Sequence, residues 1–491
     1  MTLRALGLAM SLAAGAYGAG CGDPGMGPQS PHSQNAGSPG GATGAPGTSA
    51  GAPGSGGAIP GATGGANSSG IDLAGDAKYF RFVRLTNGQW ARSVQDLLKL
   101  PSPSGLEEGF QRTVAGTTDF SNNEHFLDVN QRAWVDYRDA SEALAEQVTA
   151  SSAALSALYP GSDGAGFVTS VGRRVYRRPL SQPEISAYSS LFTQGSAMSG
   201  SKSPFAKGAA LVLRAMLQSP HFLYRTELQA TGAALSGYEL AAKLSLWLRG
   251  TTPSDALLAS AEKLTNVDAL SAQAKAMLDE PSALPVMREF QRELLHFDRY
   301  SQISKVGVPG FVEALNAELE ETSYLFFDRI FSQGLGVKDI FTSSRGFVGP
   351  EMAKLYGLGA AAKGYSEHDL GPTRVGYFAQ VPYLMLHSLN AAPDSIHRGV
   401  SLNLDVLCAP LGPPVTELPP IPPLQAGQTN RQRIDTLTSG CGGSCHNEMI
   451  NPLGFAFEHF DGMGQYRDVE NGGLRIDSSG SYNFSDGRKP F

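Results

Sequence analysis

The sequence predicts a mainly α-helical protein in which several helical domains precede a small C-terminal module. Hydroxyl residues followed three positions later by Glu or Gln recur before apolar stretches, which is the signature of a capped helix start. The apolar residues that follow repeat with the spacing of one helical face. Of the 491 residues, 41% are hydrophobic, which is enough for a sizeable core spread over two or three domains.

The first 20 residues are expected to be an export signal. Arg4 gives a small positive region, and residues 5–19 are apolar or small, a stretch shorter than the roughly 20 apolar residues of a membrane-spanning helix. Cys21 follows small residues in the manner of a lipoprotein processing site. Lipidation of Cys21 and plain secretion both stay open here, and in either case the protein leaves the cytoplasm.

Residues 21–75 differ in composition from everything that follows. They are dominated by Gly, Ala, Ser and Pro, and their glycines keep no strict three-residue period of the collagen kind. Such a segment cannot offset its chain entropy by burying apolar surface, so we expect it to be disordered. Directly after a lipid anchor, it would act as a flexible tether between a membrane and the folded body.

Four capping boxes mark helix starts in the body of the chain. They lie at Thr86–Gln89, Ser181–Glu184, Ser236–Glu239 and Thr429–Gln432. After the first box, one helical face carries Trp90, Val94, Leu97 and Leu98. After the third, one face carries Leu240, Leu244, Trp247 and Leu248. These faces are expected to be buried.

The expected domains follow from these starts and from further helical stretches over residues 205–218, 270–278, 286–297 and 312–331. We expect helical domains over residues 76–150, 160–228 and 229–345, and the C-terminal module over residues 346–491. Within that module, the Pro-rich run 410–423 favours an extended strap.

Charge and cysteine content exclude some classes of protein. The net charge of −7 gives no reason to expect a nucleic-acid partner, and four cysteines are too few for a disulfide-framed scaffold. The densest basic run is Arg173, Arg174, Arg177 and Arg178. It is interpreted as a solvated helix end, with an anion-binding patch as the alternative.

The segment Cys441-Gly-Gly-Ser-Cys445-His446 carries the strongest chemical signal. Two thiols followed at once by an imidazole are typical of covalent haem attachment, in which the His is the proximal iron ligand. The usual motif has two residues between the cysteines, and this one has three. All three are small and flexible, so the longer loop can still bring both sulfurs to the porphyrin edge.

Two other uses of the same residues stay open. A disulfide could join two of Cys408, Cys441 and Cys445 in an exported protein. A non-haem metal such as zinc would need both cysteines of the motif, His446 and a fourth ligand, and no companion pair is evident. Catalytic residues are not identified.

A haem iron would need a sixth ligand from elsewhere or an open sixth position. Met463 and His397 are the candidates we name, with His459 and Met385 as further candidates. Met449 is excluded because it lies only three residues after His446 and on the same side of the iron. Four aromatic residues after the motif would supply an apolar wall for the haem or a small core: Phe455, Phe457, Phe460 and Tyr466.

Motifs along the whole body carry a resemblance to one family. In chain order they are Arg84–Asn87 with Asp96–Leu98, Tyr176–Leu180 with Glu184, Ser219–Arg225, Tyr238–Ala241, Leu244–Leu248, His397–Gly399, Cys445-His446, Asn451–Phe455 and Phe460–Gly462. The chain resembles exported multi-domain proteins of planctomycetes and myxobacteria, in which domains of unknown function are joined to a planctomycete-type cytochrome c module.

The resemblance implies a helical exported protein with a C-terminal cytochrome-c-like domain and a covalent haem c. The expected function is redox or electron transfer at the cell envelope, with an unidentified redox partner and a lipid anchor on the outer membrane or the periplasmic face. A non-enzymatic scaffold or binding protein with a disulfide is the first alternative. A haem-dependent oxidative enzyme acting on an extracellular polymer is the second.

Overall fold

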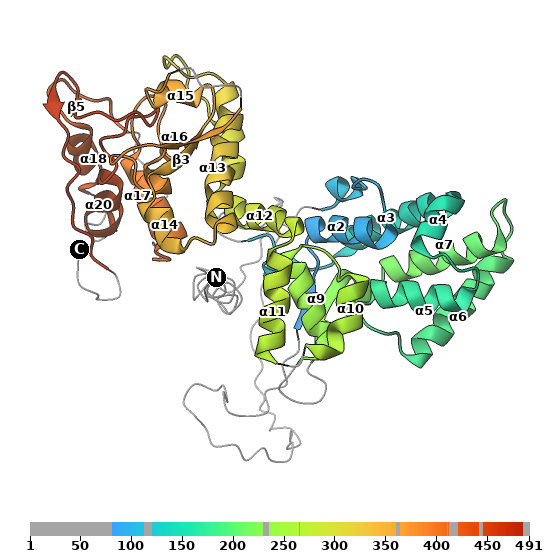
Figure 1. Cartoon of the computed structure of the whole chain (residues 1–491). Helices are drawn as coiled ribbons and strands as arrows, with labels where there is room; N and C mark the ends of the chain where they lie inside the picture. The colour runs from blue at the N-terminus through green and yellow to red at the C-terminus, as the bar shows by residue number, and fades with distance from the viewer. Residues whose placement is uncertain are drawn as a thin grey trace, which may run out of the picture.

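The computed structural model describes residues 81–111, 120–228, 235–264, 266–359, 364–409, 411, 421–440 and 445–484. The expected export signal, Cys21, the tether, Cys441 and most of the strap 410–423 lie outside these residues. The described part is mainly helical, with small two-stranded antiparallel sheets. This confirms the predicted fold class. Figure 1 shows two lobes joined through helix α12 (Leu284–Leu294).

The N-terminal lobe, residues 81–278, is built from helices around one β-ribbon. Strand β1 (Arg81–Arg84) pairs with β2 (Tyr224–Glu227), which places the start of the lobe beside a segment about 140 residues later in sequence. The helices are α2 (Asn87–Leu98), α3 (Gln131–Ala150), α4 (Ser152–Leu158), α5 (Gly164–Val175), α6 (Gln182–Ala197), α7 (Pro204–Leu217), α8 (Pro220–Leu223), α9 (Gly237–Leu248), α10 (Asp255–Ser260) and α11 (Val267–Leu278).

One hydrophobic core runs through the first two expected domains and reaches the first helix of the third. It extends from Leu85 on the first segment to Leu246 on α9 and includes Trp90, Phe167 and Val212, each with no exposed surface. Trp90, Val94, Leu97 and Leu98 are all buried, as their spacing predicted. Burial of this kind stabilises the folded chain by about 25 cal/mol for each Å² of apolar surface.

The face predicted for α9 is shifted around the helix. Leu240, Leu244, Trp247 and Leu248 are only half-buried. The buried residues of α9 are Ala241, Ala242, Ser245 and Leu246. The expectation is wrong in detail because α9 meets neighbours on two sides: Leu246 joins the main core, and Ala241 joins a small cluster with α10 and α11.

Helix α12 connects the lobes through charged side chains on both sides. Arg92 on α2 pairs with Glu289 at 3.0 Å. On the other side, Arg288 pairs with Glu321 at 3.2 Å and also with Asp328, both on α13 (Ala314–Ser332). Phe290 stacks on Phe120 with ring centroids 5.5 Å apart.

The C-terminal lobe, residues 297–484, has shorter and less regular elements. After α13 come α14 (Val337–Thr342), α15 (Met352–Leu355), α16 (Val381–Leu386), α17 (Ser395–Ser401), α18 (Asn430–Thr438) and α20 (Asn451–Phe455). Leu402–Val406 and His446–Ile450 are π-helical segments, labelled η7 and η8. Strand β3 (Arg345–Val348) pairs with β4 (Ser366–Asp369), and β5 (Val469–Glu470) with β6 (Leu474–Arg475). Short 3-10 turns occur in both lobes and just before α12. They are Leu106–Gly109, Glu124–Phe126, Ala261–Lys263, Pro281–Ala283, Phe297–Gln302 and Tyr377–Ala379.

Buried arginines hold this second lobe together. Arg398 on α17 has no exposed surface and donates to five backbone carbonyls: those of Leu384, His387, Phe457, Phe460 and Asp461. Arg374 donates to the carbonyls of Ala379 and Gly464. Burial lowers the pKa of Arg398 to about 10, so its guanidinium is charged at neutral pH.

All four predicted capping boxes are confirmed. In each box, the first hydroxyl accepts from the backbone N–H three residues later, and the Gln or Glu side chain at that later position accepts from the backbone N–H of the first residue. The boxes begin α2, α6, α9 and α18. The predicted helices over residues 205–218, 270–278 and 312–331 correspond to α7, α11 and α13. The expected helix 286–297 is α12, which ends at Leu294.

Candidate functional site

The described half of the thiol–imidazole motif lies at the start of a short helical run in the C-terminal lobe. Cys445 is exposed with a free thiol and directly precedes η8. His446 is the first residue of η8 and is half-buried. The run continues into α20, so the thiol and the imidazole stand at the end of a packed element. Cys441 lies outside the described residues.

A chain of polar contacts leads from the ring of His446 into the protein. Nδ1 of His446 lies 3.2 Å from Oδ1 of Asn451 on α20. Nδ2 of Asn451 donates to the hydroxyl of Thr438 on α18 at 2.9 Å. That hydroxyl donates in turn to the carbonyl of Ile434 at 2.9 Å. Asn451 is 1% exposed, so the imidazole is supported by a buried amide and not by solvent.

Two glycines let the helices around this site approach at backbone distance. A Cβ atom on Gly454 of α20 would lie 1.8 Å from the carbonyl oxygen of Ser395 on α17. A Cβ on Gly399 of α17 would lie 2.0 Å from the carbonyl oxygen of Ile450. Real Cβ atoms essentially never come so close, which explains why glycine stands in both segments. Helix α17 therefore packs closely against the run that carries His446.

A buried carboxylate ties the starts of α17 and α18 to the same region. Glu458 has no exposed surface and accepts hydrogen bonds from the hydroxyl of Ser395, at 2.6 Å, and from the amide of Asn430. The backbone N–H of Asn430 donates to Glu470 at 3.0 Å. Burial raises the pKa of Glu458, while these two donors and Arg398 oppose the rise. The network fixes α18, which carries Thr438.

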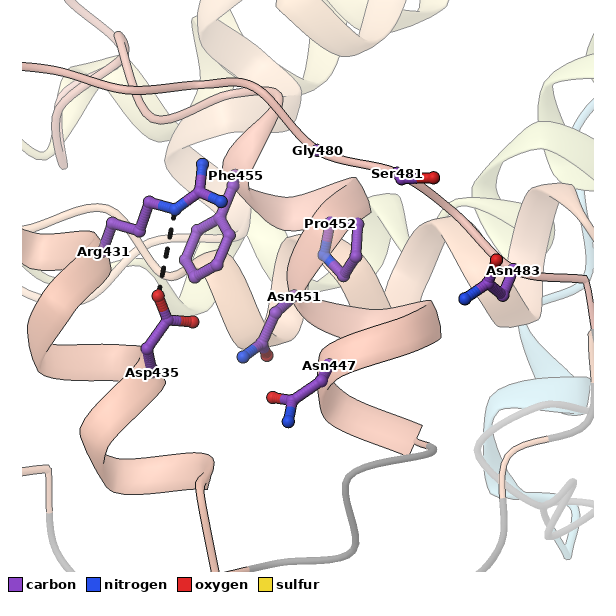
Figure 2. A pocket seen from close by; sticks show the side chains of 9 residues that line it. All are labelled: Arg431, Asp435, Asn447, Asn451, Pro452, Phe455, Gly480, Ser481 and Asn483. Atoms are coloured by element: carbon purple, nitrogen blue, oxygen red, sulfur yellow. Dashed lines mark ion pairs between the residues drawn. The ribbon is translucent and has the colours of Figure 1, made fainter. Parts of the chain in front are cut away.

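A cavity of about 510 Å³ opens beside Asn451. Figure 2 shows its lining side chains on α18, on the η8–α20 run and on the crossing segment Gly480–Asn483. They are Arg431, Asp435, Asn447, Asn451, Pro452, Phe455, Gly480, Ser481 and Asn483. The lining is mostly polar, and the guanidinium of Arg431 lies 4.6 Å from the centroid of the Phe455 ring. A mostly polar wall suits a hydrated solute better than the flat apolar face of a porphyrin.

The aromatic residues expected to form an apolar wall are used in several ways. Phe460 is buried in the second core, and Phe457 packs against that core. Phe455 lines the cavity, and Tyr466 is 41% exposed and stacks on His459. The sequence left open an apolar wall for the haem or a small core, and Phe457 and Phe460 belong to a core.

Histidine candidates for a sixth iron ligand carry other contacts. His397 lies on α17, which packs against the run of His446, and its side chain is 70% exposed. Its Nδ1 lies 2.6 Å from Asp394, and that hydrogen bond raises the pKa of His397. Nδ1 of His459 lies 2.8 Å from the carbonyl of Arg467. The role of His397 as an iron ligand stays a prediction.

The methionine candidates lie inside the second core. Met463 is 3% exposed and Met385 is 1% exposed. The backbone N–H of Met463 donates to Asp461 at 2.8 Å, which fixes the loop after Phe460. Met463 stays a prediction as an iron ligand, and a thioether so enclosed would need its loop to rearrange to reach iron.

The structure describes two of the three cysteines that the disulfide and zinc alternatives involve. Cys408 and Cys445 are both exposed with free thiols, so these two are not bridged to each other. Within the described ranges, no group of three or more His, Cys, Asp or Glu side chains is placed to hold a metal ion. The zinc alternative includes Cys441, which lies outside those ranges.

Residues that support the site were not all visible in the sequence. Asn451 and Thr438 were not recognised as partners of His446, although Asn451 lies in a motif that was noted. The arginine run does mark a helix end, since Arg173 and Arg174 lie in the last turn of α5, but it is not solvated as expected: Arg177 is 4% exposed and donates to the carbonyls of His221, Phe222 and Tyr224. Its acceptors lie more than 40 residues away in sequence, so no local pattern marks it.

Four family models match consecutive parts of the chain, and each describes a protein of unknown function. They are PSD3 (DUF1587) over residues 84–150, PSD5 (DUF1595) over 164–227, PSD4 (DUF1592) over 235–358 and PSCyt3 (DUF1588) over 374–470. The last range contains the thiol–imidazole motif, and its name carries a cytochrome label. No curated protein and no solved structure is similar to the chain.

In the described part of the chain, no helix combines the length and the apolar character needed to cross a membrane. The four matches together make the chain similar to a multi-domain protein of domains with unknown function, whose C-terminal domain carries a cytochrome-like label.

Proposed function

We propose that the protein is an exported c-type haem protein that serves redox or electron transfer at the cell envelope. The observation that carries the proposal is the exposed free thiol of Cys445 directly before His446, whose ring is oriented by a buried amide. The position of this pair within the range matched by PSCyt3 supports it.

The donor set fits a covalent haem. Each thiol would add across a vinyl group, with a new C–S bond to one vinyl carbon and the proton ending on the other, so no leaving group is needed. Cys441 and Cys445 would hold the porphyrin edge, and His446 would bind the iron through its free ring nitrogen. A haem bound there supplies one-electron redox chemistry.

The wider setting is also part of the proposal. We infer that the chain belongs with the exported multi-domain proteins of planctomycetes and myxobacteria. Cys21 would be lipidated, and residues 21–75 would tether the body to the outer membrane or the periplasmic face. The redox partner would be a protein or small carrier at the cell envelope.

The test is a visible spectrum of the protein exported together with a c-type haem maturation system. Wild type is expected to show the reduced spectrum of a c-type haem, and Cys441→Ser, Cys445→Ser should be colourless. Carbon monoxide added to the reduced protein then separates an open iron, which binds it, from a six-coordinate electron carrier. A colourless wild type would reject the haem and favour the envelope scaffold.

A further inference from the structure

The hydrogen bonds around His446 settle which of its ring nitrogens carries a proton. They start at the carbonyl oxygen of Ile434, which can only accept. The hydroxyl of Thr438, 2.9 Å away, must therefore donate to it. That leaves an oxygen lone pair on Thr438 for the side-chain amide of Asn451, so the end of the amide that faces Thr438 is the NH2 group, at 2.9 Å.

A carboxylate near the amide favours the same orientation. Asp435 lies one turn before Thr438 on α18 and lines the cavity together with Asn451 (Figure 2). Burial raises the pKa of Asp435, and Arg431 and the side chain of Asn451 oppose the rise, the latter through a hydrogen bond. A carboxylate accepts and cannot donate, so its position agrees with the same orientation of the amide, in which the NH2 group faces Thr438.

The oxygen end of the amide therefore faces His446. Oδ1 of Asn451 is an acceptor, so Nδ1 of His446, at 3.2 Å, must be its donor. A neutral imidazole protonated at Nδ1 keeps its lone pair on Nε2.

The backbone explains why a residue five positions later can reach the ring. In an α-helix with 3.6 residues per turn, positions three and four apart share a face and position five does not. Residues His446–Ile450 form a π-turn, in which the N–H of Asn451 donates to the carbonyl of His446. That wider turn brings residue 451 back over residue 446. Such turns are frequent at functional sites.

We propose that Asn451, anchored by Thr438, is a positioning residue that fixes His446 in the Nδ1–H tautomer and so reserves Nε2 for a metal. The use of Nε2 by haem iron rests on the proposed function, whereas the tautomer does not. Partners of this kind typically change metal affinity or activity about 10–100-fold when removed.

The first experiment needs no haem. Long-range ¹H–¹⁵N spectra of the histidine-labelled, haem-free chain at about pH 8, above the ordinary His pKa, report the tautomer of each ring. His446→Gln identifies the signals of His446. Wild type should show a protonated Nδ1 and an unprotonated Nε2. Asn451→Leu should give the mixed tautomers of a free imidazole, and Asn451→Asp, which keeps an acceptor, should retain the Nδ1–H form.

Two further variants guard the interpretation. Asn447→Leu makes the same change at an exposed residue next to His446 and should leave the tautomer unchanged. Thr438→Val removes the acceptor that orients the amide and should release the tautomer, which tests the proposal if Asn451→Leu does not fold. A wild-type His446 protonated at Nε2 would overturn the proposal, and so would an unchanged tautomer in a folded Asn451→Leu.

The second experiment uses the haem-loaded protein. Loss of the hydrogen bond to Nδ1 makes the imidazole a weaker electron donor to iron, so the reduction potential of Asn451→Leu should be more positive than that of wild type. Asn447→Leu should match wild type. If no haem attaches, the proposed function fails while the haem-free spectra still judge the tautomer. An unchanged potential with haem attached would contradict the role toward iron.

Discussion

The two lobes are stabilised in different ways. The N-terminal lobe encloses an apolar core of long amphipathic helices, centred on residues such as Trp90 and Val212. The C-terminal lobe also has an apolar core, but its short segments are joined by Arg398, Glu458 and Asn451, buried polar groups whose partners are distant in sequence. Local pattern can specify most of the first arrangement, with Arg177 an exception, whereas the second depends on contacts that form only after the chain has folded.

The largest effect should come from Arg398→Met. Five backbone carbonyls would lose their donor, and each buried unsatisfied acceptor costs about 1–3 kcal/mol before relaxation. We expect a loss of about 3–5 kcal/mol in the C-terminal lobe. Hydrogen exchange of peptides from residues 381–407 measures it.

The stability of the N-terminal lobe can be followed separately, because all three tryptophans lie in it: Trp90, Trp134 and Trp247. Their fluorescence should still report a folded N-terminal lobe in Arg398→Met. The control Arg345→Met removes a half-exposed arginine on β3 and should cost less than about 1 kcal/mol. Equal losses in both variants would contradict the claim that Arg398 organises its lobe.

Gly454→Ala should rank second. The new Cβ would meet the carbonyl of Ser395 at 1.8 Å, so α17 and α20 must separate. Overpacking of this kind costs about 1–3 kcal/mol, and we expect the upper end because the obstacle is backbone. Urea unfolding followed by far-UV circular dichroism measures it. Gly440→Ala, where no atom lies within 4 Å of the new Cβ, should be close to neutral.

Between pH 6.5 and pH 4.5, acid should weaken the C-terminal lobe more than the N-terminal lobe. Burial lowers the pKa of His387 in the C-terminal lobe from 6.5 to about 3. The unfolded chain then binds more protons between these values, so stability is complete above pH 6.5 and is lost as the pH falls, at up to about 1.4 kcal/mol per pH unit. In the N-terminal lobe, the hydrogen bond from Arg178 lowers the pKa of Glu184 from 4.5 to about 2, so its contribution is lost only below pH 4.5.

Hydrogen exchange of each lobe between pH 7 and pH 4 measures this difference. His387→Gln should flatten the pH dependence of the C-terminal lobe, whereas His368→Gln on the β3–β4 hairpin should not. A pH dependence of the C-terminal lobe that is the same in wild type and His387→Gln would show that His387 is not held neutral by burial.

The smallest effect should come from a helix cap in the N-terminal lobe. Thr86→Ala removes the hydroxyl that accepts from the N–H of Gln89 at 3.1 Å. Loss of an N-cap typically costs about 1 kcal/mol. The midpoint of urea unfolding by tryptophan fluorescence should fall by that amount, and Thr86→Ser should restore it. A loss of stability larger than that of Gly454→Ala would contradict the expected order of these two substitutions.

Much of the fold could be predicted because helix starts are local. A hydroxyl at Thr429 and an amide at Gln432 specify the start of α18 with no knowledge of the rest of the chain. The buried face of α9 could not be predicted, because it depends on which neighbours pack against each side. Arg177 and Arg398 could not be placed either, since their carbonyl acceptors are set by the tertiary fold.

The candidate site shows the same division. Cys445 and His446 stand out by adjacency alone, because the chemistry that would use them needs them adjacent. Asn451 stayed hidden because a partner five residues away does not fit the α-helical period. The π-turn that brings it back to His446 leaves no periodic signal in the sequence.

The most direct test of the central claim is the mass of one tryptic peptide. Cleavage after Arg433 and Arg467 releases residues 434–467, which contain both Cys441 and Cys445, from protein made with a c-type haem maturation system. The account predicts a peptide heavier by one haem, retained under reducing conditions. A peptide two hydrogens lighter, a cross-link to the peptide 399–431 that contains Cys408, or two unmodified thiols would contradict it.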